Sequence, residues 1–259
     1  MGQVPANDPV SGQTTYGFVG DGRLSRHWRH YFTSLGMPWK LWSRRLERAN
    51  GAGGSSSPAR ALADCKILLL AVSDDAIAPV LDRLRAEGLG DRTFVHFCGG
   101  RFFPGAFGAH PLMSFGTTLY EASFYRDIPV FVDAGAEQPD PVAYFRRLFP
   151  RLPNPCFELR VEDKAYYHAL CALAGGFTAV LWRDFFAAME TRFGAPREAL
   201  ASYPRRIVEN VIASGNGALT GPVARGDTAM IQTHLEALDG SELAAVYRAF
   251  IVAAGRERA

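Results

Sequence analysis

Hydrophobic and polar positions along the first 160 residues form short apolar runs separated by amphipathic segments. Apolar residues recur at helical spacing in residues 23–35, 73–84 and 141–149. The run at 66–72 is apolar throughout, which is typical of a strand buried on both faces of a parallel sheet. Alternation of strands with helices predicts an α/β domain. The runs that predict strands are residues 14–19, 39–42, 66–72, 93–97, 128–132 and 156–159.

The pattern changes near residues 158–162, after which only helical periodicity remains. Gly and Pro interrupt the helices at residues 194–196, 215–217 and 221–222. We therefore expect an α/β domain over residues 14–158 and an all-α domain over residues 159–259. Residues 1–13 are expected to form a disordered tail. The Gly- and Ser-rich stretch at 49–57 is expected to form a flexible loop.

Composition narrows the classes of function. The 28 basic and 26 acidic residues of this 259-residue chain leave a net charge of +2, which argues against a nucleic-acid groove or a polybasic membrane surface. Four scattered cysteines favour a reducing cytosol over a disulfide framework or a zinc site. Residues 1–13 contain no basic region followed by an apolar one, so we do not expect a signal peptide. The longest apolar stretch, 169–182, contains Gly175–Gly176 and is shorter than the roughly 20 residues that span a bilayer. We expect a soluble cytoplasmic protein.

A glycine-rich turn between the first strand and the first helix indicates nucleotide binding. Its sequence is Gly20-Asp21-Gly22-Arg23-Leu24-Ser25, close to the G-x-G-x-x-G dinucleotide fingerprint. The glycines let the chain turn tightly and let a pyrophosphate approach the helix N-terminus. Ser25 replaces the third glycine and is still small enough for helix–strand packing. The alternative interpretation is a plain tight turn.

The end of the second strand distinguishes NAD from NADP. NAD sites place an acidic residue there for the ribose 2′-hydroxyl, whereas this strand ends in Ser43-Arg44-Arg45. A hydroxyl and guanidinium groups suit the 2′-phosphate of NADP(H). The alternative is that both arginines lie in solvent. Further contacts to the cofactor are expected from Val72, Ser73, Asp74 and Cys98.

Several motifs occur together in one order along the chain. They are Gly20-x-Gly22-Arg23, residues 71–77, His96-x-Cys98-Gly99, residues 110–115, Lys164-x-x-Tyr167-His168 and residues 219–227 (LTGPVARGD). On these motifs, residues 16–238 resemble two-domain NADP oxidoreductases that join a Rossmann-like domain to a helical domain of unknown function. That family is similar to the 6-phosphogluconate dehydrogenase C-terminal-like superfamily. The superfamily includes pyrroline-5-carboxylate reductases, ketopantoate reductases and 3-hydroxyisobutyrate dehydrogenases.

The resemblance implies a reaction type. It implies hydride transfer from NADPH to a small C=O or C=N group, in a cleft between the two domains. It also implies a homodimer formed through the C-terminal helical domain. The partners expected are therefore a small-molecule substrate and a second copy of the chain, with neither nucleic acid nor membrane.

Polar residues that fit this chemistry lie on one predicted helix and in one predicted loop. Lys164 and His168 are four residues apart and so share a helix face, and His110 is placed in a loop after a strand, where ligand contacts gather. These three residues are the predicted catalytic groups. Related hydroxyisobutyrate dehydrogenases present a Lys and an Asn on this helix, whereas this chain has residues 174–177 (AGGF) where its family usually has the Asn. The alternatives are a solvated lysine and structural histidines.

Three further residues are candidates for substrate binding. They are Tyr167, Thr220 and Arg225, with Arg225 placed to hold a carboxylate. Arg225 and Asp227 can instead pair with each other. His27 and His30 lack a third ligand nearby, so no metal site is expected. The missing Asn and the Ser at position 25 leave a second function open, which is a catalytically silent NADP(H)-binding redox sensor or regulatory protein.

Overall fold

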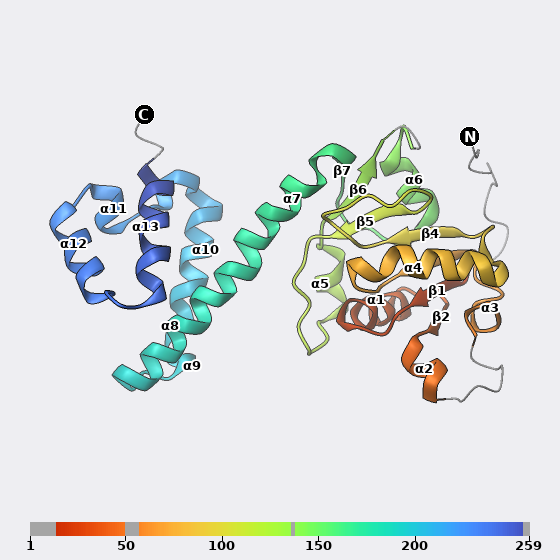
Figure 1. Cartoon of the computed structure of the whole chain (residues 1–259), viewed down its shortest axis with the longest axis horizontal. Helices are drawn as coiled ribbons and strands as arrows, with labels where there is room; N and C mark the ends of the chain where they lie inside the picture. Colours follow the sequence, from red (N-terminus) through yellow and green to blue (C-terminus); the bar gives the residue numbers. More distant parts are fainter. Residues whose placement is uncertain (1–13, 50–56, 136–137, 256–259) are drawn as a thin grey trace. The chain divides into compact units, whose positions relative to one another are not determined.

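The chain forms a seven-stranded sheet followed by helices. The computed structural model describes residues 14–49, 57–135 and 138–255. The predicted tail and most of the predicted loop at 49–57 lie outside these residues. In the order β2-β1-β3-β4-β5-β6-β7, strands β1 to β5 are parallel, β6 is antiparallel to β5, and β7 is parallel to β6 (Figure 1). The strands are β1 (Tyr16–Val19), β2 (Trp39–Trp42), β3 (Ile67–Leu70), β4 (Thr93–His96), β5 (Phe107–Pro111), β6 (Val130–Ala134) and β7 (Cys156–Arg160).

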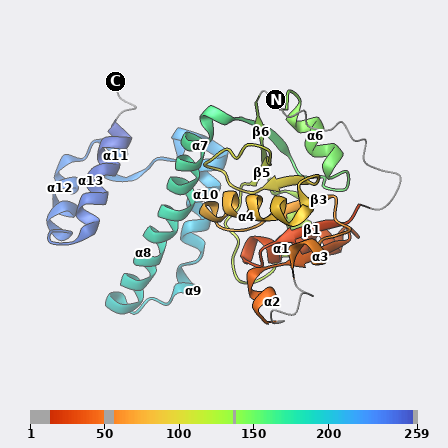
Figure 2. The same ribbon diagram turned by 45° about the vertical axis from the view of Figure 1, so that its right-hand side comes forward.

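Helices cover both faces of this sheet. Figures 1 and 2 show α1 and α4 running alongside the strands. The first face packs against α1, α5 and α6, and the second face packs against α3 and α4. The helices of this part are α1 (Arg23–Ser34), α2 (Arg44–Ala49), α3 (Pro58–Ala61), α4 (Asp74–Leu84), α5 (Ala122–Arg126) and α6 (Pro141–Leu148), with a π-helical turn, η1 (Arg85–Leu89), after α4.

Alternation along the strands explains why β3 is apolar throughout. Ile67 and Leu69 belong to the core on the first face, whereas Leu68 and Leu70 belong to the core on the second. Successive side chains of a strand point to opposite faces, so a strand covered on both sides needs apolar residues at every position. The α/β architecture predicted from the sequence is confirmed, and the sheet is parallel except where β6 pairs with β5.

Beyond Arg160 the described chain contains helices only. Its contacts divide it into two compact units, residues 1–178 and 179–259. The strands therefore end where the sequence places the change, but the first compact unit continues through α7. The remaining elements are η2 (Val161–Asp163), α7 (Lys164–Cys171), η3 (Ala172–Phe177), α8 (Thr178–Phe193), α9 (Arg197–Leu200), α10 (Ser202–Ser214), η4 (Gly215–Ala218), α11 (Gly221–Arg225), α12 (Thr228–Ala237) and α13 (Glu242–Gly255).

One helical segment is longer than the sequence predicts. It runs for 33 residues from Val161 to Phe193 and is long and apolar enough to cross a bilayer by length and composition alone. Its most apolar 18-residue window has a mean hydropathy of 1.3, and none of that window is buried. The expectation of a short stretch interrupted at Gly175–Gly176 is wrong, because both glycines lie inside the π-helical segment η3.

The sequence pattern does not predict one of the strands. Residues 107–111 (FGAHP) are expected to lie in a loop, yet they form β5, so His110 lies in a strand. Gly and Pro are poor strand formers. The segment is held by its neighbours, because β4 pairs with it on one side and β6 on the other.

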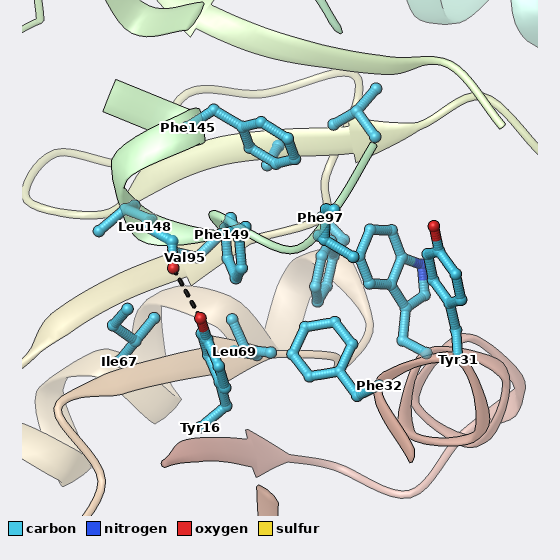
Figure 3. Packing of buried hydrophobic residues seen from close by; sticks show 14 of the residues in the cluster. Tyr16, Tyr31, Phe32, Ile67, Leu69, Val95, Phe97, Phe145, Leu148 and Phe149 are labelled. Atoms are coloured by element: carbon cyan, nitrogen blue, oxygen red, sulfur yellow. Dashed lines mark hydrogen bonds between the residues drawn. The ribbon is translucent and has the colours of Figure 1, made fainter. Parts of the chain in front are cut away.

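A buried hydrogen bond ties the first strand to the last helix of the first face. The Tyr16 ring packs between Phe32 and Phe149, and its hydroxyl donates to the Leu148 carbonyl oxygen at 2.8 Å (Figure 3). Burial raises the pKa of Tyr16 to about 12, so the hydroxyl stays protonated and donates.

Tyr16→Phe should therefore lower the free energy of unfolding of the sheet unit. The variant keeps the ring packing and leaves a buried carbonyl without its donor, which costs about 1–3 kcal/mol. Urea unfolding monitored by tryptophan fluorescence measures the change. Tyr166→Phe is the matched control, because the Tyr166 side chain is exposed and has no hydrogen-bond partner among the described residues. Equal losses in the two variants would contradict the assignment.

Candidate functional site

The first part of the candidate site is the turn after β1. β1 lies between β2 and β3, so the chain turns to one side of β1 to form β2 and crosses to the other side to form β3. The carboxyl ends of β1 and β3 therefore flank the point where ligands bind in such sheets. Gly20 has φ = +103°, and a Cβ there would overlap the carbonyl oxygen of Ala71. This glycine therefore lets the turn lie directly against the end of β3.

The N-terminus of α1 opens this turn toward a ligand. Gly22 occupies the N-cap position with no side-chain cap, and a Cβ at Gly22 would meet no atom within 4 Å. The first N–H groups of a helix need acceptors, and an anion supplies them. Ser25 is fully buried, and its Oγ has no hydrogen-bond partner among the described residues. The turn thus fits the backbone geometry that a dinucleotide pyrophosphate requires.

The three residues at the end of β2 have different surroundings. The Ser43 hydroxyl accepts a hydrogen bond from the Leu46 N–H at 3.2 Å, so it caps α2. The Arg45 Nε donates to the Asp21 carboxylate at 2.6 Å. Arg44 is exposed and makes no hydrogen bond or ion pair within the described part of the chain. Arg44 is therefore the one of these three predicted 2′-phosphate ligands that forms no hydrogen bond or ion pair with another described residue.

The turn after β3 contacts the end of β4. Ser73 is the N-cap residue of α4 and Asp74 lies in the first turn of that helix. Burial, and then a hydrogen bond with Asp74, raise the pKa of the Cys98 thiol above its ordinary value. Cys98 is therefore a neutral, buried thiol, and its contact with the cofactor stays a prediction.

A buried charge pair lies on the second face of the sheet, across three neighbouring strands. His96 in β4 is in register with Gly108 in β5, and Asp133 in β6 reaches over Gly108. A Cβ at Gly108 would overlap the Asp133 carboxylate, so the glycine leaves room for it. The Lys164 ammonium, from α7, donates to this carboxylate (Lys164–Asp133). Both side chains are buried, with exposed fractions of 2% and 4%.

His96 and Lys164 bind the two backbone polar groups of Cys98. The Cys98 N–H donates to His96 Nδ1 at 3.2 Å, and Lys164 Nζ donates to the Cys98 carbonyl oxygen at 3.0 Å. Burial, and then the charge of Lys164, lower the pKa of His96 to about 3. Burial raises the pKa of Asp133, and the Lys164 charge opposes this shift. The two hydrogen bonds therefore fix the backbone at Cys98, just after the end of β4.

Two histidine rings pack against the glycines that follow Cys98. A Cβ at Gly99 would lie 3.0 Å from the His110 ring, and a Cβ at Gly100 would lie 3.1 Å from His168 Nδ1. The ring centroids of the two histidines are 6.0 Å apart. His110 Nδ1 and the Tyr167 hydroxyl form a hydrogen bond of 2.9 Å. We call Gly99 and Gly100, with these two rings, the diglycine site.

Burial decides the charge state of one of these rings. Burial, followed by the charges of His168 and Lys164, lowers the pKa of His110 to about 4, so its ring is neutral at neutral pH. Burial likewise raises the pKa of Tyr167, which keeps its hydroxyl protonated. His168 is exposed. The site therefore combines a neutral His–Tyr pair with a histidine that is open to solvent.

The structure brings together four residues singled out from the sequence. Lys164, Tyr167 and His168 of α7 meet His110 of β5 around the diglycine site. The predicted catalytic lysine is not open to solvent, because its ammonium is enclosed by Asp133 and Cys98. The sequence prediction missed Asp133, Gly100 and Gly108. The available signal was a single acid in the otherwise apolar run VFVDA of β6.

Thr220 and Arg225 lie in the second compact unit, so their role in substrate binding stays a prediction. Thr220 is at the N-cap position of α11 and Arg225 ends that helix, and both are exposed. Asp227 accepts a hydrogen bond from the Met230 N–H at 3.1 Å and so caps α12. The alternative pairing of Asp227 with Arg225 is not observed in the described residues. These residues include no group of three or more His, Cys, Asp or Glu that could hold a metal ion.

The buried His96 ring predicts that the free energy of unfolding falls in acid. His96 has a pKa of about 3 in the folded chain, below its unfolded value of about 6.5. The unfolded state therefore takes up the proton first, and stability falls as the pH drops below about 6.5, by up to ~1.4 kcal/mol per pH unit. His96→Asn keeps an acceptor for the Cys98 N–H and removes this titration.

The slope of unfolding free energy against pH tests this prediction. Urea unfolding between pH 7 and pH 4.5 should give a shallower slope for His96→Asn than for the wild type. The comparison separates His96 from Asp133, whose raised pKa acts in the opposite direction. Identical slopes would show that His96 is not buried as a neutral ring.

Comparisons with known proteins agree with this architecture. Residues 128–253 match the family model described as a domain of unknown function, DUF2520. The chain is similar to an NADP oxidoreductase structure from Bacteroides fragilis, with a TM-score of 0.71 and 16% identity over 93% of this chain and 98% of that one. No curated protein matches the sequence.

Two solved reductases show the same fold at similar distance. A reductive aminase from Aspergillus terreus in complex with NADPH and ethyl levulinate has a TM-score of 0.60 and 16% identity, over 95% of each chain. Pyrroline carboxylate reductase from Plasmodium falciparum with NADP bound has a TM-score of 0.57 and 16% identity, over 94% of this chain and 96% of that one. At these identities the shared property is the fold. The chain has a Rossmann-type α/β domain followed by a helical region.

Proposed function

We propose that the chain is an NADP-dependent reductase of a small carbonyl or imine compound. The observation that carries this proposal is that two features lie at the carboxyl ends of parallel strands. The first is the pyrophosphate turn after β1, and the second is the diglycine site after β4. Solved structures of similar fold include reductases in complex with NADPH or NADP, which supports the choice of cofactor.

The residues of the turn provide the proposed cofactor contacts. NADP(H), when bound, supplies the hydride. The N–H groups of the first turn of α1, at Arg23 and Leu24, bind the pyrophosphate, and the Arg44 guanidinium binds the 2′-phosphate. Val72, Ser73 and Asp74 line the same edge at the end of β3. Each of these contacts uses a helix N-terminus or a strand end, which the sheet holds rigidly.

The diglycine site supplies polarisation and a proton. The neutral His110–Tyr167 pair offers hydrogen bonds to the substrate C=O or C=N, and the exposed His168 delivers the proton. We assign Lys164 a positioning role, because its ammonium holds the Cys98 carbonyl oxygen and the Asp133 carboxylate. Gly99 and Gly100 let the substrate-facing rings lie flat against the backbone.

The helical region provides the proposed dimer contact. Exposed apolar side chains follow the segment 161–193 and include Tyr166, Leu170, Leu173, Phe177 and Val180. We propose that a second copy of the chain covers them, in a homodimer formed through the helical region. Thr220 and Arg225 then contribute to the substrate site, and Arg225 suits a substrate carboxylate. The scattered cysteines favour a cytoplasmic location.

A catalytically silent NADP(H) sensor is the second candidate function. The observation that favours it is the backbone of η3, where Gly175 and Gly176 place no hydrogen-bonding side chain. NADPH consumption with a panel of keto acids, cyclic imines and aldehydes distinguishes the two functions. We expect turnover with at least one class, and at least about tenfold lower kcat for His168→Gln, because a well-placed general acid contributes about 10²–10⁴-fold. Tight NADPH binding without turnover across the panel would favour the sensor.

Arg44→Ala should weaken NADPH binding about tenfold to a hundredfold. A charge-assisted contact contributes about 1.5–3 kcal/mol, and NADH lacks the phosphate, so its affinity should stay almost unchanged. Calorimetric titration of both cofactors measures the effect. Arg48→Ala, one turn further along α2, is the control for loss of a surface charge. Equal losses for the two cofactors would show that Arg44 does not contact the 2′-phosphate.

Light scattering after gel filtration tests the dimer. We expect twice the mass of the 28.3 kDa chain, and a shift toward monomer for Leu173→Glu/Phe177→Glu, which places two charges on the exposed apolar surface. A monomeric wild type would contradict the dimer. Solubility only in detergent would contradict it as well and would indicate a membrane contact for the segment 161–193.

A further inference from the structure

An acidic side chain lies where the proposed 2′-phosphate site is expected to be positive. Asp21 is the second residue of the pyrophosphate turn, and its carboxylate pairs with Arg45. We propose that Asp21 is a specificity-determining residue that lowers the preference of this chain for NADP(H) over NAD(H). This inference rests on the proposed function, because it concerns the same cofactor site.

The sheet brings Asp21 and Arg45 together. Strands β1 and β2 are parallel neighbours with Val19 in register with Trp42, and the Gly20 N–H donates to the Trp42 carbonyl oxygen at 2.8 Å. The turns that follow the two strands therefore lie side by side. In Rossmann-type sites the adenosine ribose lies between these two turns. The Asp21–Arg45 ion pair, with 2.6 Å between Nε and Oδ2, thus bridges the place where the 2′-substituent is expected.

The carboxylate is the fixed member of the pair. The Asp21 side chain is 22% exposed, whereas that of Arg45 is 78% exposed. The hydrogen bond from Arg45, and then the Arg45 charge, lower the pKa of Asp21, so its carboxyl is ionised at neutral pH. An incoming phosphate can attract the exposed guanidinium away from the pair, whereas the less exposed carboxylate stays at the turn after β1.

The charges then oppose a 2′-phosphate. The positive charge of Arg45 is balanced by Asp21, so of the two arginines that follow β2 only Arg44 has no ion-pair partner among the described residues. The Ser43 hydroxyl accepts a hydrogen bond from the Leu46 N–H and so caps α2. A fixed carboxylate repels the dianionic phosphate and accepts hydrogen bonds from ribose hydroxyls, which is the property that selects NAD(H) in other Rossmann sites. Here that acid comes from the β1 turn and not from the end of β2.

Asp21→Asn tests the inference by calorimetric titration with NADPH, NADH, 2′,5′-ADP and 5′-AMP. Asparagine keeps the shape and an acceptor for the Arg45 Nε–H, and it removes the charge. We expect the ratio of NADPH to NADH affinity to rise about tenfold, and that of 2′,5′-ADP to 5′-AMP to rise in parallel. Addition of Arg45→Gln to this variant should remove part of the gain. Asp64→Asn, which breaks a surface pair with Lys40, controls for net charge and should leave both ratios unchanged.

The possible results separate the role of Asp21 from the proposed function. Unchanged ratios in a variant that retains the wild-type melting temperature overturn the role of Asp21 and leave the proposed function standing. A rise of the same size in Asp64→Asn also overturns that role, because it would reflect overall charge. A folded wild-type protein that binds neither NADPH nor NADH overturns the proposed function and the inference with it.

Discussion

The buried pair between Lys164 and Asp133 is the interaction on which the candidate site depends. Removing two charges from water carries a penalty of several kcal/mol per ion, which is offset only by close geometry and further hydrogen bonds. Lys164 meets this requirement with two acceptors, the Asp133 carboxylate and the Cys98 carbonyl oxygen. The pair joins α7 to β4 and β6, and it therefore fixes the helix that carries Tyr167 and His168 against the sheet.

Missing side chains are as important as charged ones in this arrangement. Gly108 leaves the space into which the Asp133 carboxylate reaches, and Gly99 and Gly100 leave the surfaces on which the two histidine rings lie. Gly20 brings the β1 turn against the end of β3. Because β1, β3 and β4 are parallel, their carboxyl ends share one edge of the sheet. A dinucleotide turn and a polar site at that edge are consequences of the topology.

Periodicity predicted most of the fold because the sheet is covered on both faces. Residues 66–72 and the helical spacing in 23–35 carry strong signals of burial, and both elements form as expected. The strand at 107–111 carries a weak signal, since Gly and Pro disfavour strands and pairing with two neighbours overrides that preference. The length of the helix at 161–193 is not evident from the sequence, because Gly175 and Gly176 indicate a break, whereas in the structure they lie inside the π-helical segment η3.

The candidate site was predicted in part for a related reason. Local spacing placed Lys164 and His168 on one helix face, and the turn at Gly20–Gly22 was visible as a motif. Asp133 and the pairing of Arg45 with Asp21 depend on contacts between strands distant in sequence, which spacing along one element does not reveal. The same holds for the burial of Lys164, because the enclosing groups come from β4 and β6.

A crystal structure of the chain with NADPH bound tests the central claim most directly. The quantity to measure is the position of the nicotinamide C4 atom relative to the diglycine site. The account predicts the pyrophosphate at the N-terminus of α1 and C4 next to Gly99 and Gly100, with His168 on the side open to substrate. Density for NADPH away from the carboxyl ends of β1, β3 and β4, or a nicotinamide ring remote from Gly99 and Gly100, would contradict it.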